Sequence, residues 1–243
     1  MPEARGLFIT GTGTEVGKTY VAARIAAALV EQGKRVGVYK PVASGCERSP
    51  QGELISADAV SLWEAAGKPG ELARVSPQKF LAPLAPHLAA REEGKEVDPA
   101  LLRSGLDYWL ERSEIVLVEG AGGLLSPLSD EEFNADLACE LGFPLVVVAA
   151  NELGTINHTL LTLVAATTFR EGIPLAGVVL NQVRPESDPS AGTNAQELVS
   201  RMVPPLLGSL GFGSSTFSEP VDWFQLARSP RKAWRSRAEV PGS

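Results

Sequence analysis

A lysine and a threonine stand side by side after a glycine-rich stretch near the start of the chain. Residues 11–19 read GTGTEVGKT; an apolar run precedes them and an alanine-rich pattern of helical period follows. This order is typical of a loop that holds a polyphosphate with backbone N–H groups and the positive end of a helix dipole. In such a loop Lys18 reaches the β- and γ-phosphates, and the Thr19 hydroxyl is a ligand of Mg²⁺.

The spacing of this loop departs from the usual motif, which has four residues between its two glycines. Here five residues separate Gly11 from Gly17. The alternative interpretation is a strand–helix turn that binds no ligand, but the flanking strand and helix patterns favour a phosphate loop. The residues expected to line the nucleotide are Gly13, Thr14, Glu15, Val16, Gly17, Lys18 and Thr19.

An acidic residue ends a second apolar run. Residues 115–123 read IVLVEGAGG, so Glu119 closes a buried strand and glycines follow. In phosphate-loop enzymes such a carboxylate holds Mg²⁺ directly or through water. A glycine such as Gly122 lets the backbone approach the γ-phosphate closely. The alternative is an ordinary strand-end carboxylate before a tight turn.

Three further polar residues, Lys40, Asp58 and Asn181, carry two interpretations each. Lys40 ends a strand pattern, where it either neutralises an anion or is simply solvated, and Ser44 offers a hydroxyl on the same loop. The position of Asp58 suits a helix cap or a first-turn carboxylate matched to the helix dipole, and spacing alone favours the cap over a third oxygen ligand of Mg²⁺. Asn181 is either a polar strand end or an amide facing the edge of an adenine base.

Apolar runs alternate with helical patterns, which predicts an α/β fold: a single-domain, phosphate-loop type with a mostly parallel central sheet and helices on both faces. The expected strands are 7–10, 36–40, 115–119, 145–149, 175–180 and 206–207. The expected helices are 18–31, 57–66, 100–111, 157–170 and 195–202, with Asn157 as an N-cap. Residues 46–54 and 184–192 look like loops. We expect one domain over 1–225 and a basic, loosely ordered tail over 226–243.

Composition limits the class of protein. A net charge of -7 over 243 residues argues against nucleic-acid binding. Cys46 and Cys139 have no metal-type spacing and suggest a reducing compartment. We find no apolar signal region and no membrane-length run, so we expect a cytoplasmic protein without a membrane partner. His87 and His158 stand in no acid–histidine–nucleophile order, which disfavours a histidine-driven hydrolase.

Six segments together resemble the dethiobiotin synthetase family. They are GTGTEVGKT at 11–19, YKPVASG at 39–45, SADA at 56–59, PHLAA at 86–90, VEGAGG at 118–123 and GTINH at 154–158. The resemblance runs from about residue 6 to residue 208, and the five-residue spacing of the phosphate loop fits that family. After residue 208 the family's Glu-Ile-Pro-like stretch is replaced by SLGFGS, and the tail differs as well.

The resemblance implies an ATP-dependent cyclo-ligase. Its substrates are 7,8-diaminononanoate, CO₂ and ATP with Mg²⁺, and it forms a carbamate and then a carbamic–phosphoric mixed anhydride before the ring closes. It also implies a homodimer with active sites at the interface.

The same resemblance implies roles for individual residues. The catalytic residues would be Lys18, Lys40 and Thr14, and the metal ligands Thr19, Asp58 and Glu119. Substrate contacts would come from Thr14, Glu15, Lys40 and Ser44, and from Gly154 and Asn157 of the partner subunit. Nucleotide contacts would include Glu119, Gly122 and, at the adenine, Asn181.

Two alternative functions stay open on sequence. A related amidoligase normally carries an additional glutamine-hydrolysing domain, for which this chain is too short. A partitioning-type ATPase switch carries an additional lysine early in the phosphate loop, where this chain has Gly13.

Overall fold

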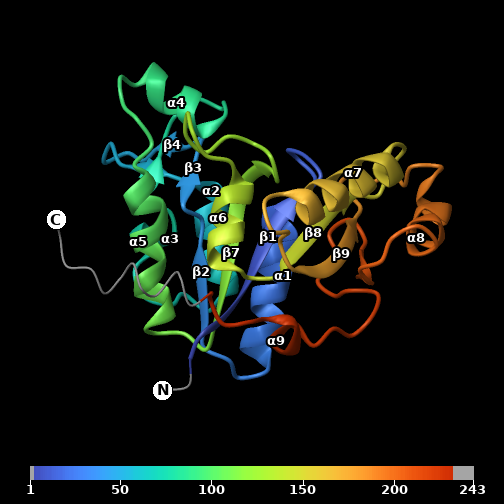
Figure 1. The fold of residues 1–243 in the computed structure, drawn as a ribbon. Helices are drawn as coiled ribbons and strands as arrows, with labels where there is room; N and C mark the ends of the chain where they lie inside the picture. Colours follow the sequence, from blue (N-terminus) through green and yellow to red (C-terminus); the bar gives the residue numbers. More distant parts are fainter. Residues whose placement is uncertain (1–2, 232–243) are drawn as a thin grey trace.

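The computed structural model describes residues 3–231, whose centre is a six-stranded sheet in the order β10-β9-β8-β1-β7-β2 (Figure 1). All neighbouring strands in it run parallel. The predicted α/β architecture with a parallel sheet is therefore confirmed. The strands are β1 (Arg5–Gly11), β2 (Val36–Tyr39), β7 (Ile115–Gly123), β8 (Leu145–Ala150), β9 (Leu175–Asn181) and β10 (Leu206–Leu210).

Helices cover both faces of this sheet. In a parallel sheet the crossover from one strand to the next is right-handed. The crossover that contains α1 moves across the sheet toward β2, whereas the crossovers that contain α5, α6 and α7 move toward β10. Thus α1 lies on one face, and the other three lie on the opposite face. The helices are α1 (Lys18–Glu31), α2 (Ala57–Ala65), α3 (Leu72–Val75), α4 (Pro86–Glu92), α5 (Pro99–Leu110), α6 (Asn134–Leu141), α7 (Thr155–Thr168), α8 (Ala191–Val199) and α9 (Trp223–Leu226).

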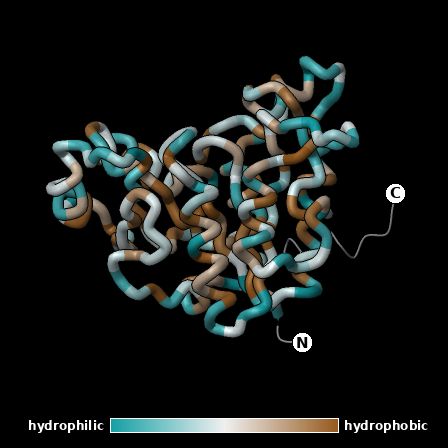
Figure 2. The backbone as a smooth tube through the Cα atoms, turned by 180° about the vertical axis from the view of Figure 1, so that it is seen from behind, coloured by the Kyte–Doolittle hydropathy of each residue, from teal (hydrophilic) through white to brown (hydrophobic). Residues whose placement is uncertain are grey.

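The strands are apolar along almost their whole length because both faces are covered. Every residue of β8 is buried, as is every residue of β2. Figure 2 shows the hydrophobic residues concentrated along the central strands and the hydrophilic residues on the peripheral loops.

Several elements differ from the sequence-based expectation. Residues 46–54 were expected to form a loop, but β4 (Glu47–Arg48) and β5 (Leu54–Ile55) pair there as an antiparallel hairpin. A second small sheet joins β3 (Val42–Ala43) to β6 (Gln78–Lys79) in parallel. The helix expected at 195–202 begins and ends earlier, as α8. The four helices absent from the prediction, α3, α4, α6 and α9, are all eight residues or shorter, too short for a clear apolar period.

The carboxyl ends of β1, β2, β7 and β9 meet at one edge of the sheet. The ladder between β1 and β7 shifts register after Ile9, and Gly11 then pairs with Gly123. The two glycine-rich segments predicted to surround a polyphosphate are therefore adjacent in space.

The first residues of the predicted tail pack against the start of the sheet. The Gly6 N–H donates to the Arg228 carbonyl at 2.8 Å, and the Arg231 N–H donates to the Leu141 carbonyl at 2.9 Å. Ala227 is buried. The remainder of the predicted tail, 232–243, lies outside the described residues, and the division at 225 stays a prediction. In the part of the chain that the structure describes, no helix has the length and apolarity to cross a membrane.

Candidate active site

The glycine-rich loop leads into a helix whose first turn is open to a ligand. Gly17 precedes α1 in the left-handed conformation, with φ of 81°, and no side chain caps this helix. A Cβ atom on Gly17 would lie 2.1 Å from the Asn181 amide nitrogen, so only glycine fits. Thr14 and Glu15 are exposed at the crest of the loop. The uncapped N–H groups of α1 are suited to bind an anion.

Lys18 folds back over the loop that precedes it. Its side chain is buried, and Nζ donates a hydrogen bond to the Gly13 carbonyl at 2.9 Å. Burial lowers the pKa of Lys18; the charge of Glu119 opposes this shift, and the charge of Lys40 adds to it. The ammonium is thus held beside the N–H groups that would bind phosphate.

Lys40 lies between two carboxylates that come from different elements. Its Nζ is 2.5 Å from Glu119 Oε1, on β7, and 2.9 Å from Asp58 Oδ2, on α2. The Lys40 side chain is only 5% exposed, so its interpretation as a solvated lysine is wrong. Burial alone would lower the pKa of Lys40, but Glu119 and Asp58 outweigh it and raise the pKa above its ordinary value. Lys40 therefore stays protonated.

Thr19 completes this group of side chains. Its hydroxyl donates to Glu119 Oε1 at 2.8 Å and lies within hydrogen-bonding reach of Asp58. Burial would raise the pKa of Asp58, but the charge of Lys40 and hydrogen bonds from Lys40 and Thr19 lower it below its ordinary value. The three residues predicted to bind the metal thus converge at one point.

One atom of this group lacks a partner. Glu119 is 1% exposed, and its Oε2 is buried without a hydrogen bond. A buried polar atom without a partner is costly unless a ligand completes it. Carboxylate and hydroxyl oxygens are the ligands that Mg²⁺ prefers, and Mg²⁺ in such sites keeps water and phosphate oxygens as well. Within residues 3–231 no group of three or more His, Cys, Asp or Glu side chains is placed to hold a metal by itself. The residues present thus fit a metal that arrives with a phosphate.

Asp58 does not cap the helix on which it lies. The side chain of Ser56 is the N-cap of α2 and accepts the Ala59 N–H at 3.2 Å, while Asp58 lies in the first turn and pairs with Lys40. The cap interpretation, which spacing alone favoured, is wrong because Ser56 already fills that position, whereas the expected first-turn carboxylate is present.

Asn181 ends β9 underneath the phosphate loop. It is 3% exposed, and its amide nitrogen donates to the Val16 carbonyl at 3.0 Å. Its Oδ1 is buried without a partner. The amide nitrogen thus supports the loop, and the unpartnered carbonyl oxygen is available to a ligand.

A cavity of about 440 Å³ lies beside the phosphate loop. Thr14 lines it from the loop, Leu125 and Ser126 line it from the segment after β7, and His158 and Leu161 line it from α7. A small organic substrate placed there would lie next to the residues that surround Lys18.

Three of the predicted substrate residues lie apart from this cluster. Ser44 is half-buried between β3 and β4. Gly154 is the N-cap of α7 with φ of 97°, so Asn157 lies in the first turn of that helix and is not its cap, contrary to the expectation. Asn157 is exposed. Because Gly154 has the left-handed conformation, the helix begins before the polar side chain that seemed to start it.

The chain has the features that define a phosphate-loop nucleotide-binding protein. They are a parallel sheet, a glycine-rich loop between β1 and α1, and an acidic residue, Glu119, on the adjacent strand β7. A family model described as an AAA domain matches residues 5–215. The chain belongs to the dethiobiotin synthetase family. It is 47% identical to the ATP-dependent dethiobiotin synthetase BioD of Rhodopirellula baltica, over 79% of this chain and 78% of that protein. It is 38% identical to BioD 1 of Escherichia coli strain K12, over 84% of this chain and 88% of that protein.

A solved structure shares the fold at low sequence identity. The signal recognition particle receptor FtsY of Elizabethkingia anophelis in complex with GDP gives a TM-score of 0.50 at 12% identity. The match covers 96% of this chain and 63% of that one, so the chain spans less than two thirds of the length of that receptor. This likeness concerns the fold alone.

Proposed function

We propose that this chain performs the reaction for which its relatives are named, the ATP-dependent formation of dethiobiotin. The substrates are 7,8-diaminononanoate, CO₂ and ATP, and the products are dethiobiotin, ADP and phosphate. The observation that carries the proposal is the group formed by Lys40, Thr19 and Glu119 at the open end of α1. Its buried, unpartnered carboxylate oxygen suits a metal–phosphate ligand.

The chemistry needs no nucleophile from the protein. One substrate amine attacks CO₂ and loses a proton, which gives a carbamate. A carbamate oxygen then attacks the γ-phosphorus, and the bond to ADP breaks. The second amine attacks the carbamoyl carbon and loses a proton, phosphate leaves, and the cyclic urea closes. Catalysis in this scheme is positioning and charge neutralisation.

The lysines and the carboxylates divide these tasks. Lys18 and Lys40 flank the transferring phosphoryl group and neutralise its charge. Thr19, Asp58 and Glu119 would hold Mg²⁺, and a bound Mg²⁺ would neutralise charge on the phosphate oxygens. The backbone at Gly122, beside the loop, and the Asn181 acceptor contact the nucleotide.

The cavity beside Thr14 suits the diamine. Thr14 lines it and is exposed, and Glu15 is the next residue along the loop. The Glu15 carboxylate would attract an ammonium before it loses its proton. Ser44, on the same loop as Lys40, would offer a further hydroxyl to the substrate.

A second copy of the chain would complete the site. Large apolar side chains are exposed on and beside α7: Leu153 is 82% exposed, Leu161 60% and Val164 58%. Exposed apolar groups of this kind favour a protein interface. Through a homodimer, Gly154 and Asn157 of one subunit would reach the diamine in the other. The mass of the protein in solution, measured by analytical ultracentrifugation, tests this; a monomer at micromolar concentration contradicts it.

One experiment decides the reaction. Phosphate release is measured with Mg-ATP and bicarbonate, with and without the diamine. We expect release only when the diamine is present, together with a product that has gained one carbonyl carbon. Release that ignores the diamine contradicts the proposal.

A further inference from the structure

The segment that follows Glu119 is held by a single side chain from the next helix. Asn134 is 0% exposed and begins α6. Its amide nitrogen donates to the carbonyls of Ala121 at 2.7 Å, Gly123 at 2.9 Å and Ser126 at 3.3 Å. Its Oδ1 accepts the Ala121 N–H at 3.0 Å. Every polar atom of this side chain is bound to the turn formed by residues 121–126.

This turn forms one wall of the candidate active site. A Cβ atom on Gly123 would lie 3.7 Å from Gly13 Cα, so the turn touches the phosphate loop. Ser126 lines the cavity of about 440 Å³, and its hydroxyl accepts the Gly123 N–H at 2.8 Å. A Cβ on Gly120 would lie 2.6 Å from Asn134 Oδ1, so the contact leaves no gap. A change in the turn would therefore move the cavity wall.

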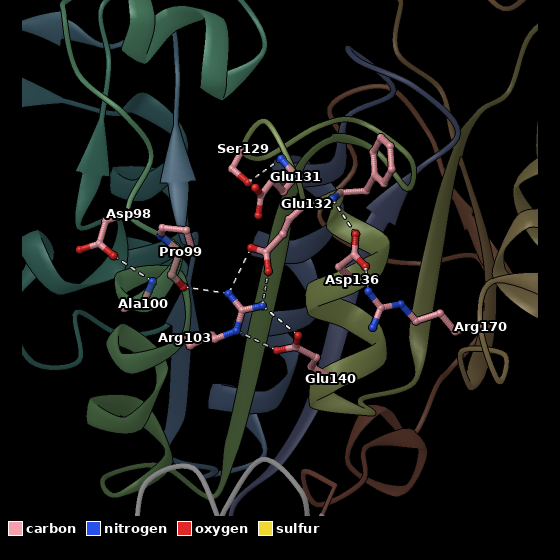
Figure 3. Close-up of polar contacts among 11 residues, drawn as sticks. Asp98, Pro99, Ala100, Arg103, Ser129, Glu131, Glu132, Asp136, Glu140 and Arg170 are labelled. Atoms are coloured by element: carbon pink, nitrogen blue, oxygen red, sulfur yellow. Dashed lines mark hydrogen bonds and ion pairs between the residues drawn. The ribbon is translucent and has the colours of Figure 1, made fainter. Parts of the chain in front are cut away.

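The helix that carries Asn134 is itself anchored by ion pairs. Figure 3 shows Arg103 of α5 between Glu132, just before α6, and Glu140 within it; the shortest contacts are 2.5 Å and 2.8 Å. Arg170, after α7, pairs with Asp136 in the first turn of α6. These contacts fix α6 between two neighbouring helices and so present Asn134 from a rigid support.

We propose that Asn134 is a positioning residue that fixes the turn 121–126 against the phosphate loop and thereby shapes the cavity for the diamine. The inference rests on the proposed function for the identity of that substrate. A carboxamide is the side chain that offers both donors and an acceptor to a backbone edge; a carboxylate of the same shape would face three carbonyl oxygens without a proton to share.

Two substitutions separate positioning from simple packing. Asn134→Ala removes all four hydrogen bonds, and Asn134→Asp keeps the shape and the acceptor but removes the donors. In each we expect the KM for the diamine to rise at least tenfold and the KM for ATP to rise by a smaller factor, because the turn lines the cavity whereas only its Gly122 backbone would contact the nucleotide. If Asn134 only fills space, the folded Asn134→Asp protein should lose stability but keep the wild-type KM for the diamine, and that result would overturn the proposal.

A matched control lies elsewhere in the protein. Gln78 is also a buried amide; it donates to the Asp98 carbonyl at 3.0 Å and accepts the Asp98 N–H at 2.7 Å. Gln78→Ala should lower the melting temperature and leave both KM values unchanged. If this variant raised the KM for the diamine as much as the Asn134 variants do, the effect at Asn134 would reflect general loosening and the proposal would fail.

A second measurement does not depend on the reaction. Hydrogen exchange of a peptide spanning residues 120–127 should speed up at least tenfold in the folded Asn134→Ala protein, while peptides from β8 keep their rates. Unchanged exchange in 120–127 contradicts the proposal even if activity falls. If the wild type shows no diamine-dependent phosphate release, the proposed function fails, and the exchange result still decides whether Asn134 holds the turn. Should Asn134→Ala not fold, Asn134→Ser, which keeps one donor and one acceptor, is measured in the same way.

Discussion

Two basic side chains in this molecule each bridge a pair of carboxylates, yet the two groups are built differently. Around Arg103, both Glu132 and Glu140 receive paired hydrogen bonds from the guanidinium, and the side chains are about a fifth exposed, at 17%, 24% and 19%. Around Lys40, Glu119 is 1% exposed and one of its oxygens has no partner.

This difference indicates that the Arg103 group is a structural support and that the Lys40 group is part of a ligand-binding site. The Arg103 group is saturated and ties α5 to α6. Lys40 and Glu119 are more deeply buried than the Arg103 group, and one oxygen of Glu119 is left without a partner. This arrangement costs stability, and proteins tolerate such a cost where a ligand completes the arrangement.

The strongest test of this comparison is the removal of the buried Lys40 ammonium. We expect Lys40→Met to lower diamine-dependent phosphate release by about 100- to 1000-fold, because a preorganised positive charge beside the phosphoryl group is lost. Initial rates at saturating substrates measure this effect. Lys68→Met, at an exposed lysine that pairs with Glu64, is the control and should keep the wild-type rate. A Lys40→Met rate within tenfold of the wild type would remove its catalytic role.

The next test addresses the unpartnered oxygen. Glu119→Gln keeps the shape but removes the charge, so we expect the Mg²⁺ concentration for half-maximal rate to rise about ten- to a hundredfold. A Mg²⁺ titration of phosphate release gives this value. An unchanged titration curve would show that Glu119 does not hold the metal.

A substitution in the Arg103 group should lower stability and leave activity nearly unchanged. Arg103→Met should lower the free energy of unfolding by about 1–3 kcal/mol, because two partly buried carboxylates lose their hydrogen-bond donors. Both KM values and kcat should change less than threefold, since Arg170 still ties α6 to its neighbour. Urea unfolding measures the free energy of unfolding, and steady-state kinetics give the KM values and kcat. A large loss of activity without loss of stability would contradict the distinction.

The smallest effect is expected at Asp58. Its pKa is lowered in the folded state from the ordinary value of 3.8, so its contribution to stability is complete above that value and is lost as pH falls through the folded-state pKa. The wild type should exceed Asp58→Asn in unfolding free energy at pH 7 by less than about 1 kcal/mol, because the side chain is 47% exposed. This gap should close in acid. A gap that is constant down to pH 2 would rule out the ion pair as its cause.

The sequence predicted the parts of the site that short motifs encode. Lys18 and Thr19 follow a glycine-rich loop, and Glu119 ends an apolar strand, so their types and order were enough to place them at one sheet edge. The convergence of Asp58 with Lys40 was not derivable from spacing, because it depends on how α2 folds back toward β2.

Asn134 carries no comparable signal. It begins a helix of eight residues after Phe133, a position without a side-chain cap, and its partners are backbone groups. A residue that recognises main-chain atoms leaves no pattern of side-chain types in the sequence. The prediction that Asn157 caps the start of α7 was wrong for a related reason, because the left-handed backbone of Gly154 decides where α7 begins.

The formal charges of the two lysines and two carboxylates that meet below the phosphate loop cancel, while the loop itself carries the exposed carboxylate of Glu15. Lys18 and Lys40 contribute two positive charges, and Asp58 and Glu119 contribute two negative ones, in a chain whose net charge is -7. Such an electroneutral pocket exerts little long-range attraction on an incoming anion. The association rate of Mg-ATP should therefore depend weakly on ionic strength, and selection among anions falls to the short-range geometry of the amides at the start of α1.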